Sequence, residues 1–181
     1  MPAAVLALAV LGWLYATSTP RYALYRLGVA MQQRSVAAAE RFFDLERIAD
    51  TATDVIVADY LARQPAPTSA AESLGRQVAG TLAKRRMRPQ VLTRVRAEIR
   101  RSVERAGLQP TAFVVPVGAV AVLRALEVSW DGPDAWVTYR DPAQGPVRFR
   151  MRYQADRGWL ISEFDPDWVR RRAQEESPRV R

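Results

Sequence analysis

The spacing of apolar residues changes once along this chain of 181 residues, near Gly107. Before that point, apolar residues recur every three or four positions, which is the period of an amphipathic helix. After it, β-branched and aromatic residues alternate with polar ones, which is the period of a half-buried strand. Helices followed by strands are typical of an α+β domain, so we predict about four helices packed on one face of a curled antiparallel sheet of four to five strands.

Four helices are predicted between Pro20 and Gly107. Pro20 fits the first turn of a helix, Thr68 or Ser69 fits an N-cap, and Pro89 marks the start of the fourth helix. The apolar stripes of the four helices are Leu24, Leu27, Met31 and Ser35; Leu45, Ile48, Ala49, Ala52, Ile56 and Tyr60; Leu74, Val78 and Leu82; and Leu92, Val95, Ile99 and Val103.

The strands are predicted at residues 112–117, 120–130, 135–140, 147–154 and 159–164. The segment 147–154 is the clearest of them, because apolar and polar residues alternate along it without exception. Residues 131–134 and 156–158 have turn composition. A last short helix begins at Asp165 and is followed by a disordered basic tail, residues 171–181.

A hydrophobic segment, residues 1–16, precedes this single domain, which spans residues 17–170. Pro2–Ala16 contains no charged residue, and its 15 residues fall between a signal-peptide core and the length needed to cross a bilayer. We interpret it as a retained membrane anchor with Trp13 and Tyr15 at the interface; an ordinary buried helix is the alternative. Arg21 and Arg26 follow the segment, which by the positive-inside rule alone favours a cytoplasmic domain.

The absence of Cys and His excludes several chemistries. It rules out thiol nucleophiles, disulfides, Cys/His zinc sites and every catalytic triad with an imidazole base. The sequence also contains no glycine-rich phosphate loop or nucleophile elbow, so no cofactor and no catalytic residue is predicted. We therefore favour a non-enzymatic protein.

The strongest charge feature lies between residues 84 and 105, where nine basic residues stand against two acidic ones. For a tethered domain, anionic phospholipid headgroups are the nearest polyanion. Nucleic acid is the competing interpretation, although the stretch lacks aromatic residues for base stacking. The commonest role of such a stretch is a solvated helix face. The basic residues are Lys84, Arg85, Arg86, Arg88, Arg94, Arg96, Arg100, Arg101 and Arg105.

Three further groups are candidates for sites. Arg148, Arg150 and Arg152 share one strand face and could bind a carboxylate or phosphate, although such rows are more often balanced by cross-strand partners, here Glu127 or Glu163. Glu46, Asp50 and Asp54 recur every fourth residue on a helix, which is more typical of solvated surface than of a metal or acid/base site. A pocket between sheet and helices would be lined by Trp130, Trp136, Phe149, Met151, Tyr153 and Trp159, unless these side chains form the core.

Three segments resemble a known family. Residues 20–27 (PRYALYRL), behind the apolar segment and followed by Ala30 and Arg34, resemble the opening of the bacterial proteins grouped as domain of unknown function 2939. Residues 87–92 resemble a helix start of that family, with Arg88 in place of its threonine, and residues 158–161 (GWLI) resemble its closing strand. The resemblance covers residues 17–165. The family's usual basic residue before the anchor is missing here.

The resemblance implies an extracytoplasmic domain tethered to the inner membrane by a single pass, with a fold similar to nuclear-transport-factor-2-like domains. It implies no activity. We accordingly predict a membrane-tethered binding or interaction module of the bacterial envelope, whose partner is an anionic lipid or another envelope protein. The alternatives are a small-ligand carrier or enzyme with a pocket between sheet and helices, and a nucleic-acid binder that uses residues 84–105.

Overall fold

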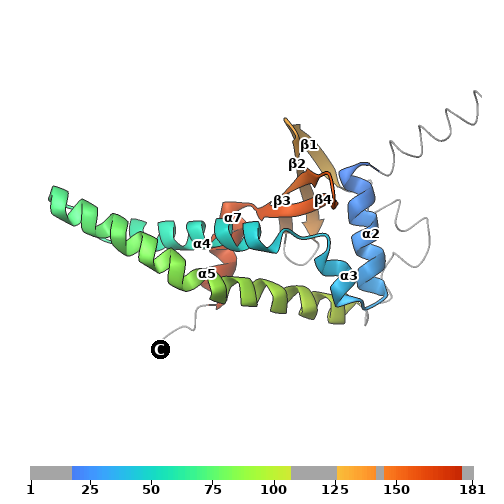
Figure 1. Cartoon of the computed structure of the whole chain (residues 1–181), viewed down its shortest axis with the longest axis horizontal. Helices are drawn as coiled ribbons and strands as arrows, with labels where there is room; N and C mark the ends of the chain where they lie inside the picture. Colours follow the sequence, from blue (N-terminus) through green and yellow to red (C-terminus); the bar gives the residue numbers. More distant parts are fainter. Residues whose placement is uncertain (1–17, 107–125, 142–144, 177–181) are drawn as a thin grey trace, which may run out of the picture.

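The computed structural model describes residues 18–106, 126–141 and 145–176. Within them the chain forms five helices and one four-stranded antiparallel sheet, which confirms the predicted α+β class (Figure 1). The helices are α2 (Pro20–Gln32), α3 (Val36–Glu40), α4 (Leu45–Ala62), α5 (Ala70–Ala106) and α7 (Pro166–Glu176). The strands, which are neighbours in sequence order, are β1 (Glu127–Asp131), β2 (Asp134–Asp141), β3 (Gly145–Gln154) and β4 (Gly158–Phe164).

Several predictions fall outside the described residues. They are the hydrophobic segment Pro2–Ala16, the strand at 112–117 and the first part of the strand at 120–130. In the part of the chain that the structure describes, no helix is both long and apolar enough to cross a membrane.

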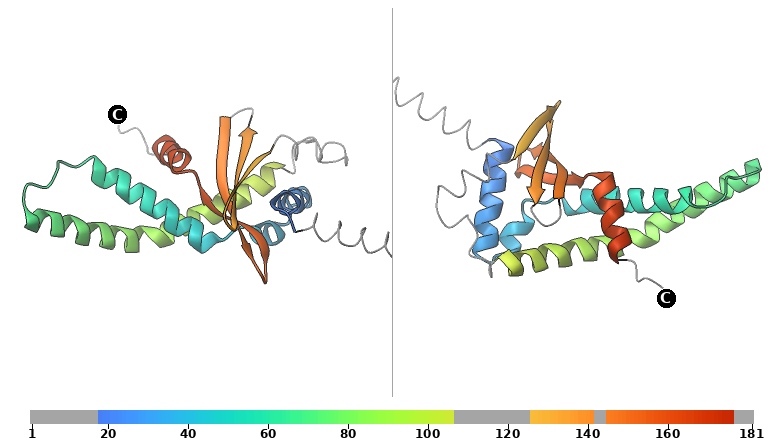
Figure 2. Two further views of the ribbon diagram at one scale, coloured as in Figure 1. Left: turned by 90° about the horizontal axis from the view of Figure 1, so that it is seen from above. Right: turned by 180° about the vertical axis from the view of Figure 1, so that it is seen from behind.

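The sheet has one apolar face, which follows from the alternation along β3. Phe149 and Met151 are buried, as are their β2 partners Val137 and Ala135. This face packs against α2, α3, the start of α4 and the C-terminal half of α5, so the core lies between the sheet and these helices (Figure 2). α4 also packs against β4, where Leu160 is fully buried. The helical members of the core are Ala23, Leu27, Ala30, Ala39, Ile48, Ile99 and Val103.

The outer edge of β4 is covered by the chain between α3 and α4. The Ile161 N–H donates to the Phe42 carbonyl at 2.8 Å, and the Asp44 N–H donates to the Ile161 carbonyl at 2.8 Å. The Asp44 side chain then caps α4 by accepting the Arg47 N–H at 3.2 Å. An uncovered edge strand presents unpaired backbone groups, so this short parallel bridge protects the edge and also fixes where α4 begins.

The first predicted helix is in fact two helices. α2 ends at Gln32, and Arg34 adopts a φ of 54°, in the left-handed region that residues with a Cβ rarely occupy. Ser35 then caps α3 by accepting the Ala38 N–H at 3.3 Å. The predicted apolar stripe of the first helix was therefore wrong at Ser35. This serine caps the next helix and is not part of a continuing helix face.

The third and fourth predicted helices are instead one continuous helix, α5, with Pro89 inside it. Proline lacks the N–H that would bond to the carbonyl four residues earlier, and it usually ends or kinks a helix. Beside it, Arg88 forms ion pairs with both Glu46, at 2.6 Å, and Asp50. These pairs join α5 to α4 at the point where Pro89 interrupts the hydrogen bonding within α5. The expectation that proline marks a helix end considers only neighbouring residues, so it could not predict them.

The C-terminal helix is longer than predicted. Asp165 caps α7 by accepting the N–H groups of Asp167 at 2.9 Å and Trp168 at 3.2 Å. Trp168 stacks on Phe164, with 5.0 Å between the ring centroids. Because α7 runs to Glu176, residues 171–176 are helical, whereas we predicted them as the start of a disordered tail.

α4 and the N-terminal half of α5 form an arm, residues 54–88, that projects from the rest of the described structure (Figures 1 and 2). The two helices approach closely at Gly80, where an added Cβ would meet Leu61 Cδ1 at 3.1 Å. Lys84 pairs with Asp54 of α4 at 2.8 Å. The tip of the arm and the start of α2 lie at opposite ends of the longest axis (Figure 1).

Candidate interaction surfaces

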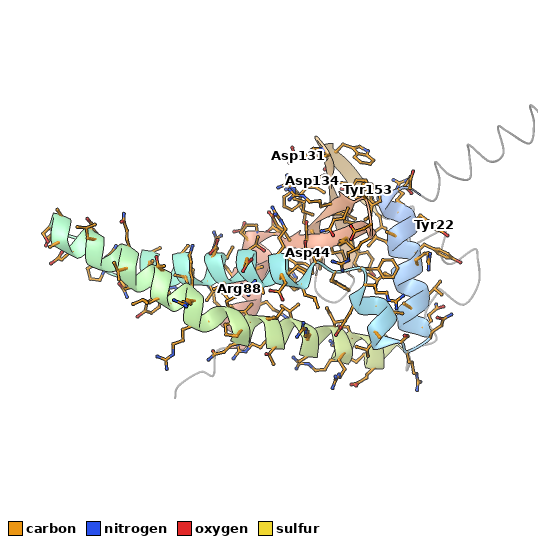
Figure 3. All side chains as sticks on the ribbon, viewed as in Figure 1. Tyr22, Asp44, Arg88, Asp131, Asp134 and Tyr153 are labelled. Carbon is orange, nitrogen blue, oxygen red and sulfur yellow. The ribbon has the colours of Figure 1, made fainter. Side chains whose placement is uncertain are left out.

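The arginine row on β3 is largely engaged by carboxylates within the sheet, chiefly Asp131 and Asp134, which are labelled in Figure 3. Arg152 donates to Asp134 through two nitrogens, at 2.9 and 2.8 Å. Arg150 donates to Asp131 at 3.0 Å, and its Nε lies 3.0 Å from Asp134. This row therefore does not offer a set of free guanidinium groups to a carboxylate or phosphate ligand.

Asp134 is the centre of this network. Its side chain is only 2% exposed, and the hydrogen bonds from Arg152 lower its pKa below the usual range despite the opposing effect of burial. Of the two predicted cross-strand partners, Glu163 lies 3.9 Å from Arg150, whereas Glu127 pairs with Arg140 at 3.2 Å. Cross-strand carboxylates therefore balance the arginines of β3, as predicted. The main one is Asp134, which the sequence indicated only as part of a turn.

The six aromatic and methionine candidates do not share one environment. Phe149, Met151 and Trp159 are buried on the apolar face. Trp136 lies on the opposite face, where the guanidinium of Arg148 is 4.6 Å from its ring centroid. The remaining two, Trp130 and Tyr153, are exposed beside Trp159.

The acidic row of α4 faces α5 along the line where the two helices meet. Glu46, Asp50 and Asp54 have side chains 59%, 53% and 60% exposed, and each forms an ion pair with Arg88 or Lys84. Within the described residues, no group of three or more acidic side chains is placed to hold a metal ion. The row therefore serves to align the two helices.

The nine basic residues of 84–105 divide into two sets. Lys84 and Arg88 pair with α4, and Arg101 and Arg105 both pair with Glu98, at 2.8 Å each. Arg94 is exposed and also takes part in an interaction. The other four are exposed and have no ion-pair partner among the described residues. These are Arg85, Arg86, Arg96 and Arg100.

The unpaired arginines continue an exposed apolar stripe on the same helix. Leu74, Val78 and Leu82 are 62%, 58% and 61% exposed. At 100° per residue, positions 74, 78, 82 and 85 fall within a sector of about 80° on the side of α5 away from Gly80 and α4. Beyond Pro89, the exposed Arg96 and Arg100 fall at the same angles, beside the buried Val103. Arg86 lies about 40° beyond this sector and borders it. We call this surface the outer face of α5 and define it as Leu74, Val78, Leu82, Arg85, Arg96 and Arg100, with Arg86 at its border.

Comparison of the chain with family models, with curated proteins and with solved structures finds no match. The resemblance to domain of unknown function 2939 therefore stays a prediction.

Two residues that matter in the structure carry no sequence signal of their own. Asp134 could have been found by extending the β2–β3 pairing from the clear strand 147–154, because that register places it opposite Arg152. Ser18, whose carbonyl accepts the indole N–H of Trp159 at 2.6 Å, could not have been found in this way. A backbone carbonyl carries no pattern, so only the folded chain reveals this contact.

Proposed function

We propose that this chain is a membrane-tethered, non-enzymatic interaction module of the bacterial envelope, in which the outer face of α5 binds a segment of another protein. One observation carries the proposal. Three exposed apolar side chains lie in a row on one face of α5 in the arm, and four exposed arginines without an ion-pair partner in the described residues follow them along the helix. Contiguous exposed apolar surface beside arginines is typical of protein interfaces.

The chemistry of the outer face indicates the kind of segment that would fit. Leu74, Val78 and Leu82 follow one another at intervals of four, and this ridge can pack against the apolar stripe of a second helix. Arg85 and Arg96 continue the same line and can each bind a carboxylate through two hydrogen bonds. The expected partner is therefore an amphipathic helix that is apolar in one half and acidic in the other.

The position of the arm favours a protein over a lipid surface. The predicted anchor, residues 1–16, joins the domain just before α2, and the tip of the arm lies at the other end of the longest axis (Figure 1). A tether at the α2 end would hold the tip away from the bilayer. Nucleic acid is disfavoured because α5 contains no aromatic residue on which bases could stack.

Two finer expectations belong to the same proposal. The resemblance to domain of unknown function 2939 supports an inner-membrane tether with an extracytoplasmic domain. A likeness to nuclear-transport-factor-2-like folds is supported by helices that precede an antiparallel sheet and pack on its apolar face. Both stay predictions.

The proposal is tested by photocross-linking in the cells from which the chain comes. A photoreactive phenylalanine analogue is placed at Val78 of the full chain, and the matched control carries it at Ala58, an exposed position on α4 of the same arm. We expect a discrete protein adduct from position 78 and none from position 58. The adduct should disappear when Arg85, Arg86, Arg96 and Arg100 are all replaced by Gln.

Two outcomes would contradict the proposal. Equal adducts from both positions would mean that the arm touches its surroundings without a specific face. Label that enters only lipid would mean that the outer face of α5 lies on a membrane, and anionic phospholipid would then replace protein as its ligand.

A further inference from the structure

A second exposed surface lies at the opposite end of the molecule from the arm tip. Trp130 of β1 and Tyr153 of β3 are 62% and 51% exposed. Both rings make T-shaped contacts with the ring of Trp159 of β4, at centroid distances of 5.5 and 5.7 Å. We call these three residues the aromatic collar. Their side chains lie on the same face of the sheet, and Tyr153 lies close to the start of α2 (Figure 3).

The collar is fixed to the place where the described chain begins. The indole N–H of Trp159 donates to the carbonyl of Ser18 at 2.6 Å. Thr19 then caps α2 by accepting the Tyr22 N–H at 3.3 Å. In the sequence, the uncharged segment Pro2–Ala16 ends two residues before Ser18. The collar therefore lies at the root of the predicted membrane anchor.

The exposure of the collar is costly in water. Their contacts with Trp159 recover part of the apolar area of Trp130 and Tyr153, but more than half of each side chain stays hydrated. At a membrane surface the same side chains are favoured, because the rings enter the headgroup region while the indole N–H and phenol O–H keep polar partners. Tyr25 of α2 is a further exposed aromatic residue of this type. Its side chain is 37% exposed, and its ring centroid lies 6.2 Å from that of Tyr22 on the same helix.

We propose that the aromatic collar is a membrane-contact surface. In this arrangement Trp130 and Tyr153 lie in the headgroup layer of the bilayer that contains the predicted anchor. The inference depends on the proposed tether and adds to it the orientation of the domain. The occupant is a bilayer interface because the collar borders the point at which an apolar segment of membrane-like composition joins the domain.

The test uses the full chain, which contains no Cys, reconstituted into vesicles of neutral phosphatidylcholine so that the arginines of α5 contribute no attraction. A single cysteine is introduced as Trp130→Cys and labelled with an environment-sensitive fluorophore. The control, Ser129→Cys, is the preceding residue of β1, also exposed but on the opposite sheet face. Tyr153→Cys is the second test position, in case loss of the Trp130 ring disturbs Trp159.

We expect lipids with a nitroxide quencher in the headgroup region to quench the label at 130 and at 153 several-fold more strongly than the label at 129. A chain that floats with the vesicles but shows equal, weak quenching at all three positions would overturn the collar and leave the tether intact. A chain that fails to float with the vesicles would overturn the tether and the collar together. Neither result would affect photocross-linking at position 78, which reports on the arm.

Discussion

The sheet and the arm both join their elements with rows of acid–arginine pairs, yet the two rows differ in burial. In the sheet, Asp134 is 2% exposed and is shared by Arg150 and Arg152. Between α4 and α5, in the arm and at its base, every carboxylate paired with Lys84 or Arg88 is more than half exposed. A buried carboxylate that loses its partners leaves an uncompensated charge, whereas an exposed one is simply rehydrated. The sheet is therefore a fixed platform, and the arm keeps a surface that a partner can use.

The sharpest test of this difference is one substitution made in both regions. Leu160 of β4 is fully buried and Leu82 of the arm is 61% exposed. We expect Leu160→Ala to lower the free energy of unfolding by about 3 kcal/mol through lost burial and a residual cavity. Leu82→Ala should change it by no more than about 0.5 kcal/mol. Urea unfolding of the full chain in detergent, followed by circular dichroism, measures both; equal losses would abolish the distinction.

The charged pairs give the next largest contrast. Asp134→Ala should lower the free energy of unfolding by about 2 kcal/mol, less than a fully buried pair would lose because Arg150 and Arg152 are partly hydrated. Asp54→Ala, which removes the partner of Lys84, should cost less than about 1 kcal/mol. The same unfolding measurement applies. A larger loss from Asp54→Ala would show that the arm depends on its ion pairs as the sheet does.

The pH dependence separates the two regions again. The pKa of Asp134 is lowered in the folded chain, so its stabilising contribution is fully present above the ordinary Asp pKa of about 3.9 and is lost as the pH falls through the lower folded value. The difference in unfolding free energy between wild type and Asp134→Asn should therefore be constant near neutrality and shrink below about pH 4. A difference that grows on acidification would contradict the assignment of the Arg152 hydrogen bonds as its cause.

The smallest expected effect is that of salt on the arm. Lys84→Gln should cost a few tenths of a kcal/mol in low salt, and the loss should vanish in about 1 M NaCl because exposed pairs are screened. The effect of Asp134→Ala should be much less sensitive to salt. If both variants respond to salt alike, then burial is not what distinguishes the two rows.

The fold class could be predicted because its signals are local. The alternation of residues 147–154 needs only one exposed and one buried sheet face, and Gly158, with a φ of 78°, supplies the turn that follows. The two errors in the helices have the opposite origin. Arg34 breaks a stripe without a glycine or proline to announce it. α5 continues through Pro89 where it packs against α4, and Arg88 there pairs with residues about forty positions away in the sequence.

The candidate surfaces were only partly predictable, since spacing shows which residues share a face but not what covers that face. Leu74, Val78 and Leu82 have the same four-residue spacing as Ile99 and Val103, yet the first three are exposed and the last two are buried. The difference is that α2 and α3 reach the C-terminal half of α5 and do not reach the arm (Figure 1). The basic cluster was visible in the sequence, but its division into paired and unpaired arginines depends on Glu98 and on the α4 carboxylates.

The central claim is that the tethered end and the partner-binding arm are separate surfaces. Its most direct test is to place the fluorescent label at Val78→Cys in the same neutral vesicles and to repeat the lipid-quenching measurement. The account predicts that this label lies in water, reached by iodide and unaffected by quenching lipids. Quenching at position 78 as strong as at position 130 would contradict it, because the arm would then lie on the bilayer beside the collar.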